Sequence, residues 1–418
     1  MRKWIVIVFL LPVALLAQEL QSDFDLAHDS SDFAIQIYGQ GYYQSQGISN
    51  DFINKFIYGG FVDQPLKDKV EGQLLEEGNR FAVGFSTGVR FYDMRDSVFH
   101  NANWGFGINL EHHTLTSSKF SRDLFHGLFT GNADRLGITM KMGNSTMNSV
   151  TFQEFGYSLI YKPRGCIFGI SAIKGQGHSS FNMGTMDLYT ETDATSLDLN
   201  ASGIIRRTDS SRNRIATLNG FGAAINVIYN IPLTATSGGN SSLSEAFTKH
   251  EVGTLRLSVD NLGFISWIRN PQVTRIDSSY NFSGYYIENL LEEDYQNWFN
   301  ADELRDSLAP ESKSENYSTI LPAVFSIDFI PTMTGGKKMN GVAGARYQLN
   351  SDYRPLVYAG VLYQFHPKVQ GSLIGIVGGY GEITAGLRLK YSSKNIEAFL
   401  SSNNMIGMVS PNGYGKNI

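Results

Sequence analysis

Several long stretches of this 418-residue chain alternate between an apolar side chain and a small or polar one. In residues 79–93, NRFAVGFSTGVRFYD, phenylalanine and valine take most odd positions, whereas the even positions include two glycines, Ser86 and Arg90. The same alternation recurs in residues 217–230 and 381–391. Successive side chains of a β-strand point to opposite faces. Each stretch therefore predicts a strand with one apolar face and one small or polar face.

A soluble β-sandwich also alternates, but three features favour strands that cross a membrane. Aromatic residues lie near strand ends (Trp104, Tyr229 and Tyr391), as in interfacial girdles. The opposite face carries mainly glycine, serine, asparagine and isolated charges. Short connections such as 162–165 alternate with long ones such as 232–251. We therefore expect an all-β fold, a transmembrane antiparallel up-and-down β-barrel of about 14 strands.

The first residues, MRKWIVIVFLLPVALLAQ, place two basic residues before an apolar run that ends near Ala17. This pattern predicts a signal peptide over 1–17 and leaves 18–418 as the barrel domain. No later stretch approaches the roughly 18 consecutive apolar residues of a membrane helix. The 43 glycines, 27 phenylalanines, 21 tyrosines and only 17% charged residues fit membrane strands. The expected location is the outer membrane of a Gram-negative cell.

A formal net charge of -5 gives no reason to expect nucleic acid as a partner. The single cysteine, Cys166, excludes an intramolecular disulfide.

Two inserts are expected to be helical, near 52–77 and near 288–309. Asp63 is placed as an N-cap in the first insert, and Pro310 as a stop signal after the second. Such inserts would either decorate a rim or plug the lumen, and the sequence leaves both open. The polar region 183–208 is either two strands that extend beyond the membrane or one long loop.

Charged residues fall on the parity that should face the interior of the barrel. A lipid-facing Arg or Lys at mid-membrane would cost roughly 2–4 kcal/mol, so this parity supports the barrel. The predicted lumen-lining residues are Arg90, Glu111, Lys141, Arg256, Asp260, Asp328, Arg346, Arg388 and Lys390. They would form either a network of paired charges that holds loops or a plug, or a mildly cationic interior that binds anionic or amphipathic solutes.

The sequence GFSTG around Ser86 matches the G-x-S-x-G nucleophile signature. It lies within an alternating strand, however, without the strained strand-to-helix turn on which that signature depends. If residues 81–92 and 104–113 form a hairpin, Ser86 lies opposite about Leu110, and His113 is about 7–10 Å away. Since a nucleophile and its base need hydrogen-bonding distance, we expect no catalytic residues.

Parity also separates the adjacent residues Glu111, His112 and His113 in WGFGINLEHH. His112 shares the lipid-facing parity of Trp104, whereas Glu111 and His113 face the interior. The chain has no H-E-x-x-H motif and no cysteine cluster, so neither a metal site nor a cofactor is expected. The remaining histidines, among them His126, are expected in loops or at rims on the surface.

The parity of apolar residues switches between Val259 and Leu262, which predicts a β-bulge at Asn261, Leu262 and Gly263. A bulge near a rim can open a lateral gap in the wall.

Five segments together resemble a family of outer-membrane barrels from Bacteroidota that carries the unknown-function label DUF5723. These segments are residues 50–70, 78–92, 258–267, 353–360 and 378–387. The family is similar to type IX secretion barrels and, more distantly, to fatty-acid transport (FadL-like) barrels, which release apolar cargo through a lateral opening. The resemblance implies an outer-membrane barrel of about 14 strands with an N-terminal or loop-derived plug, and it supplies no catalytic residues.

The leading functional hypothesis is transport of a small hydrophobic or amphipathic solute through a plugged lumen, without catalysis. The alternatives are a secretion-system accessory or scaffold that binds a partner protein, and a disfavoured integral-membrane hydrolase. Expected partners are outer-membrane lipid, a hydrophobic or amphipathic ligand, or a secretion-system or surface protein. A lumen lined by apolar side chains and blocked by residues 44–79 would favour transport; one filled with paired charges, together with an exposed aromatic loop surface, would favour a scaffold.

Overall fold

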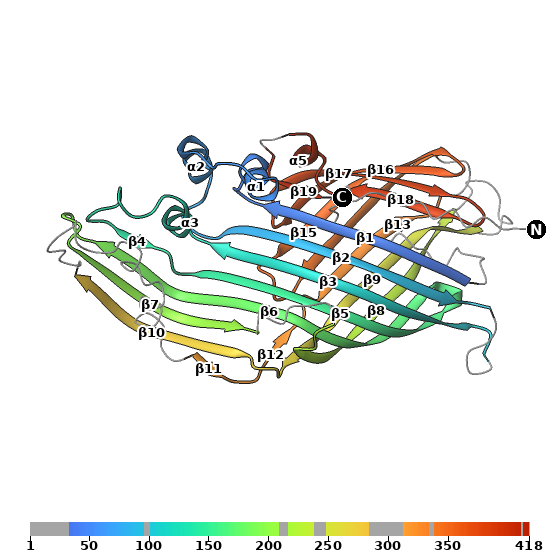
Figure 1. The fold of residues 1–418 in the computed structure, drawn as a ribbon. Coiled ribbons are helices and arrows are strands. Elements are labelled where there is room, and N and C mark those ends of the chain that lie inside the picture. Colours follow the sequence, from blue (N-terminus) through green and yellow to red (C-terminus); the bar gives the residue numbers. More distant parts are fainter. Residues whose placement is uncertain are drawn as a thin grey trace, which may run out of the picture.

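One antiparallel sheet of 19 strands dominates the chain (Figure 1). The computed structural model describes residues 33–95, 101–208, 216–237, 248–283, 312–333, 338–410 and 413–417. The predicted signal peptide over 1–17 and the predicted insert near 288–309 lie outside these residues. The all-β prediction is confirmed.

The main part of the sheet is a continuous antiparallel ladder in which most strands pair with their neighbours in sequence. Its order is β19, β1, β2, β3, β5, β6, β8, β9, β13, β14, β15, β16, β17, β18. The first seven in chain order are β1 (Phe33–Ser45), β2 (Asn79–Asp93), β3 (Trp104–Phe120), β5 (Ser145–Tyr161), β6 (Cys166–Thr190), β8 (Gly220–Ser237) and β9 (Thr248–Trp267). The others are β13 (Val324–Pro331), β14 (Met339–Gln348), β15 (Arg354–His366), β16 (Val369–Gly379), β17 (Ile383–Ser392), β18 (Glu397–Ser402) and β19 (Gly415–Asn417).

A second group of strands extends the sheet at one end, at the lower left of Figure 1. The far half of β6 pairs there with β7 (Ser196–Arg207) and β4 (Thr139–Lys141), and β7 pairs with β10 (Gln272–Ser283). The short strands β11 (Ser312–Ser314) and β12 (Tyr317–Ile320) add to β10 and β9. The region 183–208, which the sequence left open, is therefore the end of β6 and the whole of β7.

Three helices lie together beside the ends of β1 to β3 (Figure 1). They are α1 (Asn50–Ile57), α2 (Gln64–Glu71) and α3 (Arg122–Phe129). Asp63 accepts a hydrogen bond from the Leu66 backbone N–H, as a helix N-cap does. Phe52, Val70 and Phe125 are buried among these helices. A 3-10 turn (Lys162–Arg164) and the short α5 (Met405–Val409) complete the helical elements of the described chain.

No helix in the described part of the chain combines the length and the apolar character that a membrane span requires.

The two faces of the main ladder differ as the alternation predicts. Along β1, the exposed Phe33, Ile35 and Ile37 alternate with less exposed neighbours. The opposite face carries the largest buried apolar cluster, whose aromatic members include Tyr42, Phe152, Trp267, Tyr353 and Tyr380. The core therefore lies on this opposite face of the ladder.

Candidate functional site

The face of the main ladder opposite the exposed apolar residues, here called the inner face, lines a partly open cavity of about 210 Å³. Side chains from strands far apart in the ladder line it together, from Tyr38 on β1 to Arg346 on β14. The sheet therefore curves enough for these strands to face one space. Of the predicted lumen-lining residues, six contribute to this lining: Arg90, Glu111, Arg256, Asp260, Asp328 and Arg346.

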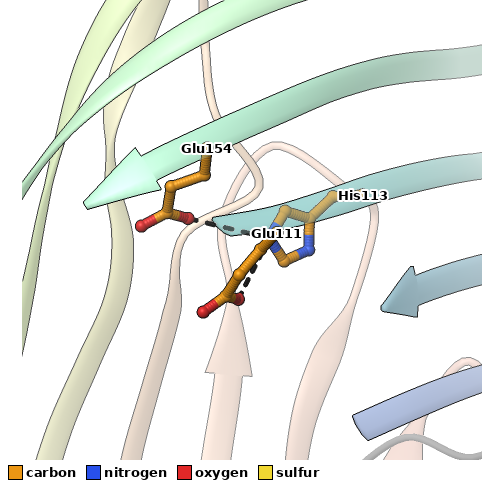
Figure 2. A group of neighbouring side chains, drawn as sticks. All are labelled: Glu111, His113 and Glu154. Carbon is orange, nitrogen blue, oxygen red and sulfur yellow. Dashed lines mark ion pairs between the residues drawn. The ribbon is translucent and has the colours of Figure 1, made fainter. Parts of the chain in front are cut away.

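Three of the lining side chains converge on one point: Glu111, His113 and Glu154 (Figure 2). Glu111 and His113 are two residues apart on β3 and share a face, and Glu154 is directly opposite Glu111 on β5. His113 Nε2 lies 3.4 Å from Glu111 Oε2 and 3.6 Å from Glu154 Oε2. The side chains of Glu111 and Glu154 are only 5% and 3% exposed. Two buried carboxylates thus share one imidazole.

Glu111 is held by donors from the neighbouring strands. The Arg90 guanidinium donates from Nε to Oε1 at 2.7 Å and from Nη2 to Oε2 at 3.2 Å. This bidentate geometry fixes the orientation of the carboxylate plane and places a positive charge beside it. The Tyr38 hydroxyl also donates to Oε2, and Asn109 Nδ2 donates to Oε1 at 3.1 Å. The carboxylate is therefore rigidly oriented towards His113.

Glu154 is held in the same way through its other oxygen. Ser171 Oγ donates to Oε1 at 2.5 Å, and Asn226 Nδ2 donates to it at 2.7 Å. Asn109 Nδ2 lies 3.2 Å from the same atom and so joins the two carboxylates. A Cβ atom at Gly156 would lie 2.0 Å from Asn109 Oδ1. Glycine at this position therefore gives Asn109 the room that it needs.

Asn226 also connects the site to the segment in which the sequence predicts a bulge. The β8–β9 ladder shifts register between Ile225 and Val227, and Asn261 has a φ of 57°. The Asn261 backbone N–H donates to Asn226 Oδ1 at 2.7 Å. Since Asn226 Nδ2 donates to Glu154, this irregular part of the wall helps to orient the carboxylate.

His113 is positioned by Ser86 and Phe152. Its Nδ1 lies 2.9 Å from Ser86 Oγ, and its ring stacks on Phe152 with 4.8 Å between centroids. The predicted separation of about 7–10 Å was wrong, because it assumed that Ser86 is opposite about Leu110. In the structure, Ser86 is directly opposite His113.

Two other predicted interior charges that line the cavity, Asp328 and Arg256, have hydrogen-bond partners outside this cluster. Asp328 has its own donors, Tyr358 Oη at 2.6 Å and Ser326 Oγ at 3.0 Å, and Arg256 Nε donates to Asn230 Oδ1 at 3.0 Å. Arg388 and Lys390 lie on β17 and do not line the cavity, and Lys390 Nζ lies 2.7 Å from Glu397 Oε1 of β18.

The prediction for Lys141 was wrong. This residue is exposed on β4, which pairs with the far half of β6 rather than with the wall of the cavity. Parity was counted along a strand of the main ladder, whereas residues 139–141 form a short strand of the extension.

The prediction of a surface position for His126 was also wrong. His126 lies on α3 and is 2% exposed. Its Nδ1 and Nε2 lie 2.8 Å from Glu71 Oε2 and from Asp134 Oδ1. Burial alone would disfavour the charged imidazole, but the hydrogen bonds with Glu71 and Asp134 outweigh it and raise the pKa of His126. His126, Glu71 and Asp134 together link α2 to α3, and none of the three lines the cavity.

The cluster around His113 offers two kinds of chemistry. The order Ser86, His113, carboxylate is that of a hydrolase triad. However, β2 and β3 pair with strands on both sides, so their backbone N–H groups serve the ladder rather than an oxyanion hole. One imidazole and two carboxylates are also a ligand set for divalent metal ions. Sequence motifs missed this set because Glu154 comes from a different strand.

Comparison with known proteins gives one match and one negative result. A family model described as a family of unknown function (DUF5723) matches residues 33–403. No curated protein matches the chain. The matched region runs from the start of β1 to just beyond β18, and so it contains the cavity and all residues of the cluster.

Proposed function

The chain belongs to this family of unknown function (DUF5723), and we propose that it is a transmembrane β-barrel of the Gram-negative outer membrane that transports a small amphipathic solute. The single observation that carries the proposal is the contrast between an apolar outer face and an inner face whose cavity is lined by both charged and apolar side chains. The barrel would contain about 14 strands, in the order of the main ladder.

The outer face supports the membrane location. Every strand of the main ladder from β1 to β18 carries at least one large exposed apolar side chain. One from each strand is Ile37, Phe85, Leu110, Phe155, Ile170, Phe221, Phe264, Ile327, Tyr347, Val361, Leu373, Leu389 and Leu400. A continuous apolar surface of this extent is unfavourable in water, whereas lipid covers it without cost.

The extension supports the same location by contrast. Within the described chain, no large exposed apolar residue lies on β7 or β10. On β6 such residues are confined to Phe168 and Ile170, at the end that belongs to the main ladder. Apart from Ile320 on β12, which pairs with the main-ladder strand β9, no described strand of the extension carries such a residue. We propose that the extension lies in water beyond the bilayer.

Closure of the barrel would join the two edges of the ladder. In the described residues, β18 pairs on one side only, with β17. All of β1 pairs with β2 on one side, but residues 33–41 have no described strand on the other side. The short β19 covers only Tyr42, Tyr43 and Gln44 at the other end of β1. We propose that β18 and β1 lie along the closing seam.

The cavity supports the proposed class of solute. Its lining combines charged side chains such as Arg90 and Arg346 with apolar ones such as Leu115 and Phe152. A volume of about 210 Å³ is smaller than that of most drug-sized sites, which is roughly 300–1,000 Å³. A small solute, or one end of a longer amphipathic molecule, fits this space.

Residues 44–79 do not supply the plug that the transport hypothesis expected. Among them, none lines the cavity, and α1 and α2 pack instead with α3. Buried aromatic side chains such as Tyr42, Trp267 and Tyr380 fill the interior beside the cavity. We propose that movement of these side chains, rather than of a helical plug, opens the route for the solute.

The transport proposal is tested with proteoliposomes and two neighbouring variants on β6. Gly169 lines the cavity, and its added Cβ would meet other atoms only at 3.4 Å or more, so Gly169→Phe narrows the space. Ile170 is 68% exposed on the opposite face, so Ile170→Phe is the matched control. We expect Gly169→Phe to reduce the flux of a radiolabelled medium-chain carboxylate while Ile170→Phe leaves it unchanged. Flux equal to that of protein-free liposomes would contradict transport.

One observation favours the scaffold as a second candidate. The cluster of α1, α2 and α3 with its connecting residues, here called the helical rim, carries exposed apolar side chains: Tyr58 is 71%, Phe61 83% and Leu128 71% exposed. The cavity also contains paired charges, such as Arg90 with Glu111. A partner protein that binds this rim should co-purify from native outer membranes in mild detergent at a fixed ratio. It should be lost when Phe61 is changed to Ser.

A further inference from the structure

We propose that Glu111, His113 and Glu154 bind a divalent transition-metal ion, with Zn²⁺ as the reference ion. The site consists of one imidazole nitrogen and two carboxylate oxygens that all lie within 4.8 Å of one another. This mixed set of nitrogen and oxygen ligands suits Zn²⁺, Mn²⁺ or Fe²⁺ rather than an ion that prefers oxygen alone. The inference does not depend on transport or on the membrane location.

The distances within the site fit a bridging ion better than hydrogen bonds. His113 Nε2 is 3.4 Å from Glu111 Oε2 and 3.6 Å from Glu154 Oε2. Hydrogen bonds between nitrogen and a carboxylate oxygen are shorter, at about 2.7–2.9 Å. A tetrahedral ion with bonds of about 2.1 Å holds its ligand atoms about 3.4 Å apart. Small side-chain movements would therefore complete the coordination.

The imidazole nitrogen that faces the carboxylates has no other partner. Among the described residues, His113 Nε2 is a buried atom without a hydrogen bond. When Nδ1 carries the proton and donates it to Ser86 Oγ, Nε2 presents its lone pair to the two carboxylates. Three electron-rich atoms then point at one place, which is an unfavourable arrangement unless a metal ion occupies it or Nε2 takes up a proton.

The surroundings have the features of an outer ligand shell. Arg90 and Asn109 donate to Oε1 of Glu111, and Arg90 and Tyr38 donate to its Oε2 as well. Ser171 and Asn226 donate to Oε1 of Glu154. Ser86 fixes the imidazole through Nδ1. Partners of this kind orient metal ligands and set the protonation of the histidine.

The site also has access to the cavity. All three ligands belong to the cavity lining, so the coordination positions that the protein leaves free would face this space. A water molecule or a donor atom of a small molecule in the cavity would complete the ion's shell there. The same cluster without metal would be an ion network in which a protonated His113 balances the charge of the second carboxylate.

The test uses the full chain, without a histidine tag, folded in detergent and stripped of metal by a chelator that is then removed. Zn²⁺ binding is measured by calorimetry and bound metal by elemental analysis, and Co²⁺ is added as a spectroscopic probe. We expect one Zn²⁺ per chain and visible Co²⁺ absorption bands that indicate nitrogen and oxygen ligands. If the folded wild-type chain binds neither ion at a saturable site, the proposal is wrong and His113 belongs to an ion network.

Two isosteric variants locate the ion. Glu154→Gln keeps the size of the side chain but removes its charge, and we expect at least a tenfold loss of Zn²⁺ affinity and loss of the Co²⁺ bands. Asp328→Asn is the matched control, because Asp328 is a buried carboxylate that lines the same cavity with its own donors. Circular dichroism verifies that both variants are folded. Unchanged affinity in folded Glu154→Gln, or equal loss in both variants, would overturn the assignment.

Discussion

Ser86 and His113 are directly opposite each other on β2 and β3, with 2.9 Å between Ser86 Oγ and His113 Nδ1. This contact orients the imidazole towards two carboxylates, and we assign it a positioning role rather than a catalytic one. The two interpretations differ in what removal of the hydroxyl should do.

We expect Ser86→Ala to leave ester hydrolysis by the purified protein at the level of wild type. Ser86 lies in a regular strand without a strained turn, and the adjacent backbone N–H groups serve the ladder. Hydrolysis of a chromogenic ester and of a phospholipid in mixed micelles measures this. A wild-type rate above the protein-free blank that disappears in Ser86→Ala would restore the hydrolase hypothesis.

Arg90→Met should destabilise the folded protein by about 3–5 kcal/mol, because it leaves the buried Glu111 carboxylate without its main charged partner. The matched control is Arg275→Met, which removes an Arg–Glu pair with Glu315 whose side chains are 57% and 47% exposed. An exposed pair contributes little, so this variant should unfold as wild type does. Denaturant unfolding in detergent compares the two. Equal midpoints for both variants would show that the Arg90–Glu111 pair does not matter for stability.

The cluster of His126, Glu71 and Asp134 should make stability depend on pH. The folded-state pKa of His126 is raised above its usual value of about 6.5. Its contribution is therefore fully present below pH 6.5 and is lost as the pH rises through the raised pKa. Unfolding midpoints measured from pH 6 to 9 should fall for wild type over that interval. His126→Asn should remove this step; if the step persists in the variant, another group causes it.

A charge on the outer face should interfere with membrane insertion. Ile170→Arg places a guanidinium in the proposed lipid-facing band, at a cost of roughly 2–4 kcal/mol near mid-membrane. Leu128→Arg is the control, because Leu128 is 71% exposed on the helical rim. Folding yield into lipid vesicles should decrease for Ile170→Arg alone. A soluble sheet would tolerate both substitutions equally, and equal yields would contradict the membrane location.

Alternation predicts the strands and their faces but not their alignment. The pattern around Ser86 and Arg90 correctly indicates which side chains share the inner face. Because side chains alternate with a period of two, shifting a strand by two residues relative to its neighbour leaves the same side chains on the same face. Alternation therefore does not determine the register between strands. β3 also continues through residues 114–120, where polar residues hide the alternation. The Ser86–His113 contact was therefore beyond the reach of the sequence.

Glu154 was also missing from the predicted lumen-lining residues, for a different reason. It has the same parity as Gly156 and Ser158, opposite to the apolar Phe155 and Tyr157. The rule that selected Glu111 would have selected it too. What the sequence could not provide is its partner, because the pairing of Glu154 with Glu111 depends on the β3–β5 register.

The length of β6 has a mechanical consequence. Its 25 residues span about 80 Å at about 3.3 Å per residue, far more than the roughly 30 Å of a bilayer core. One hydrogen-bonded strand thus belongs both to the wall and to the extension, without a flexible linker between them. A molecule that docks on β7 or β10 would be held at a fixed distance and orientation relative to the wall. A force on the extension would be transmitted directly into β6, the strand that carries Ser171.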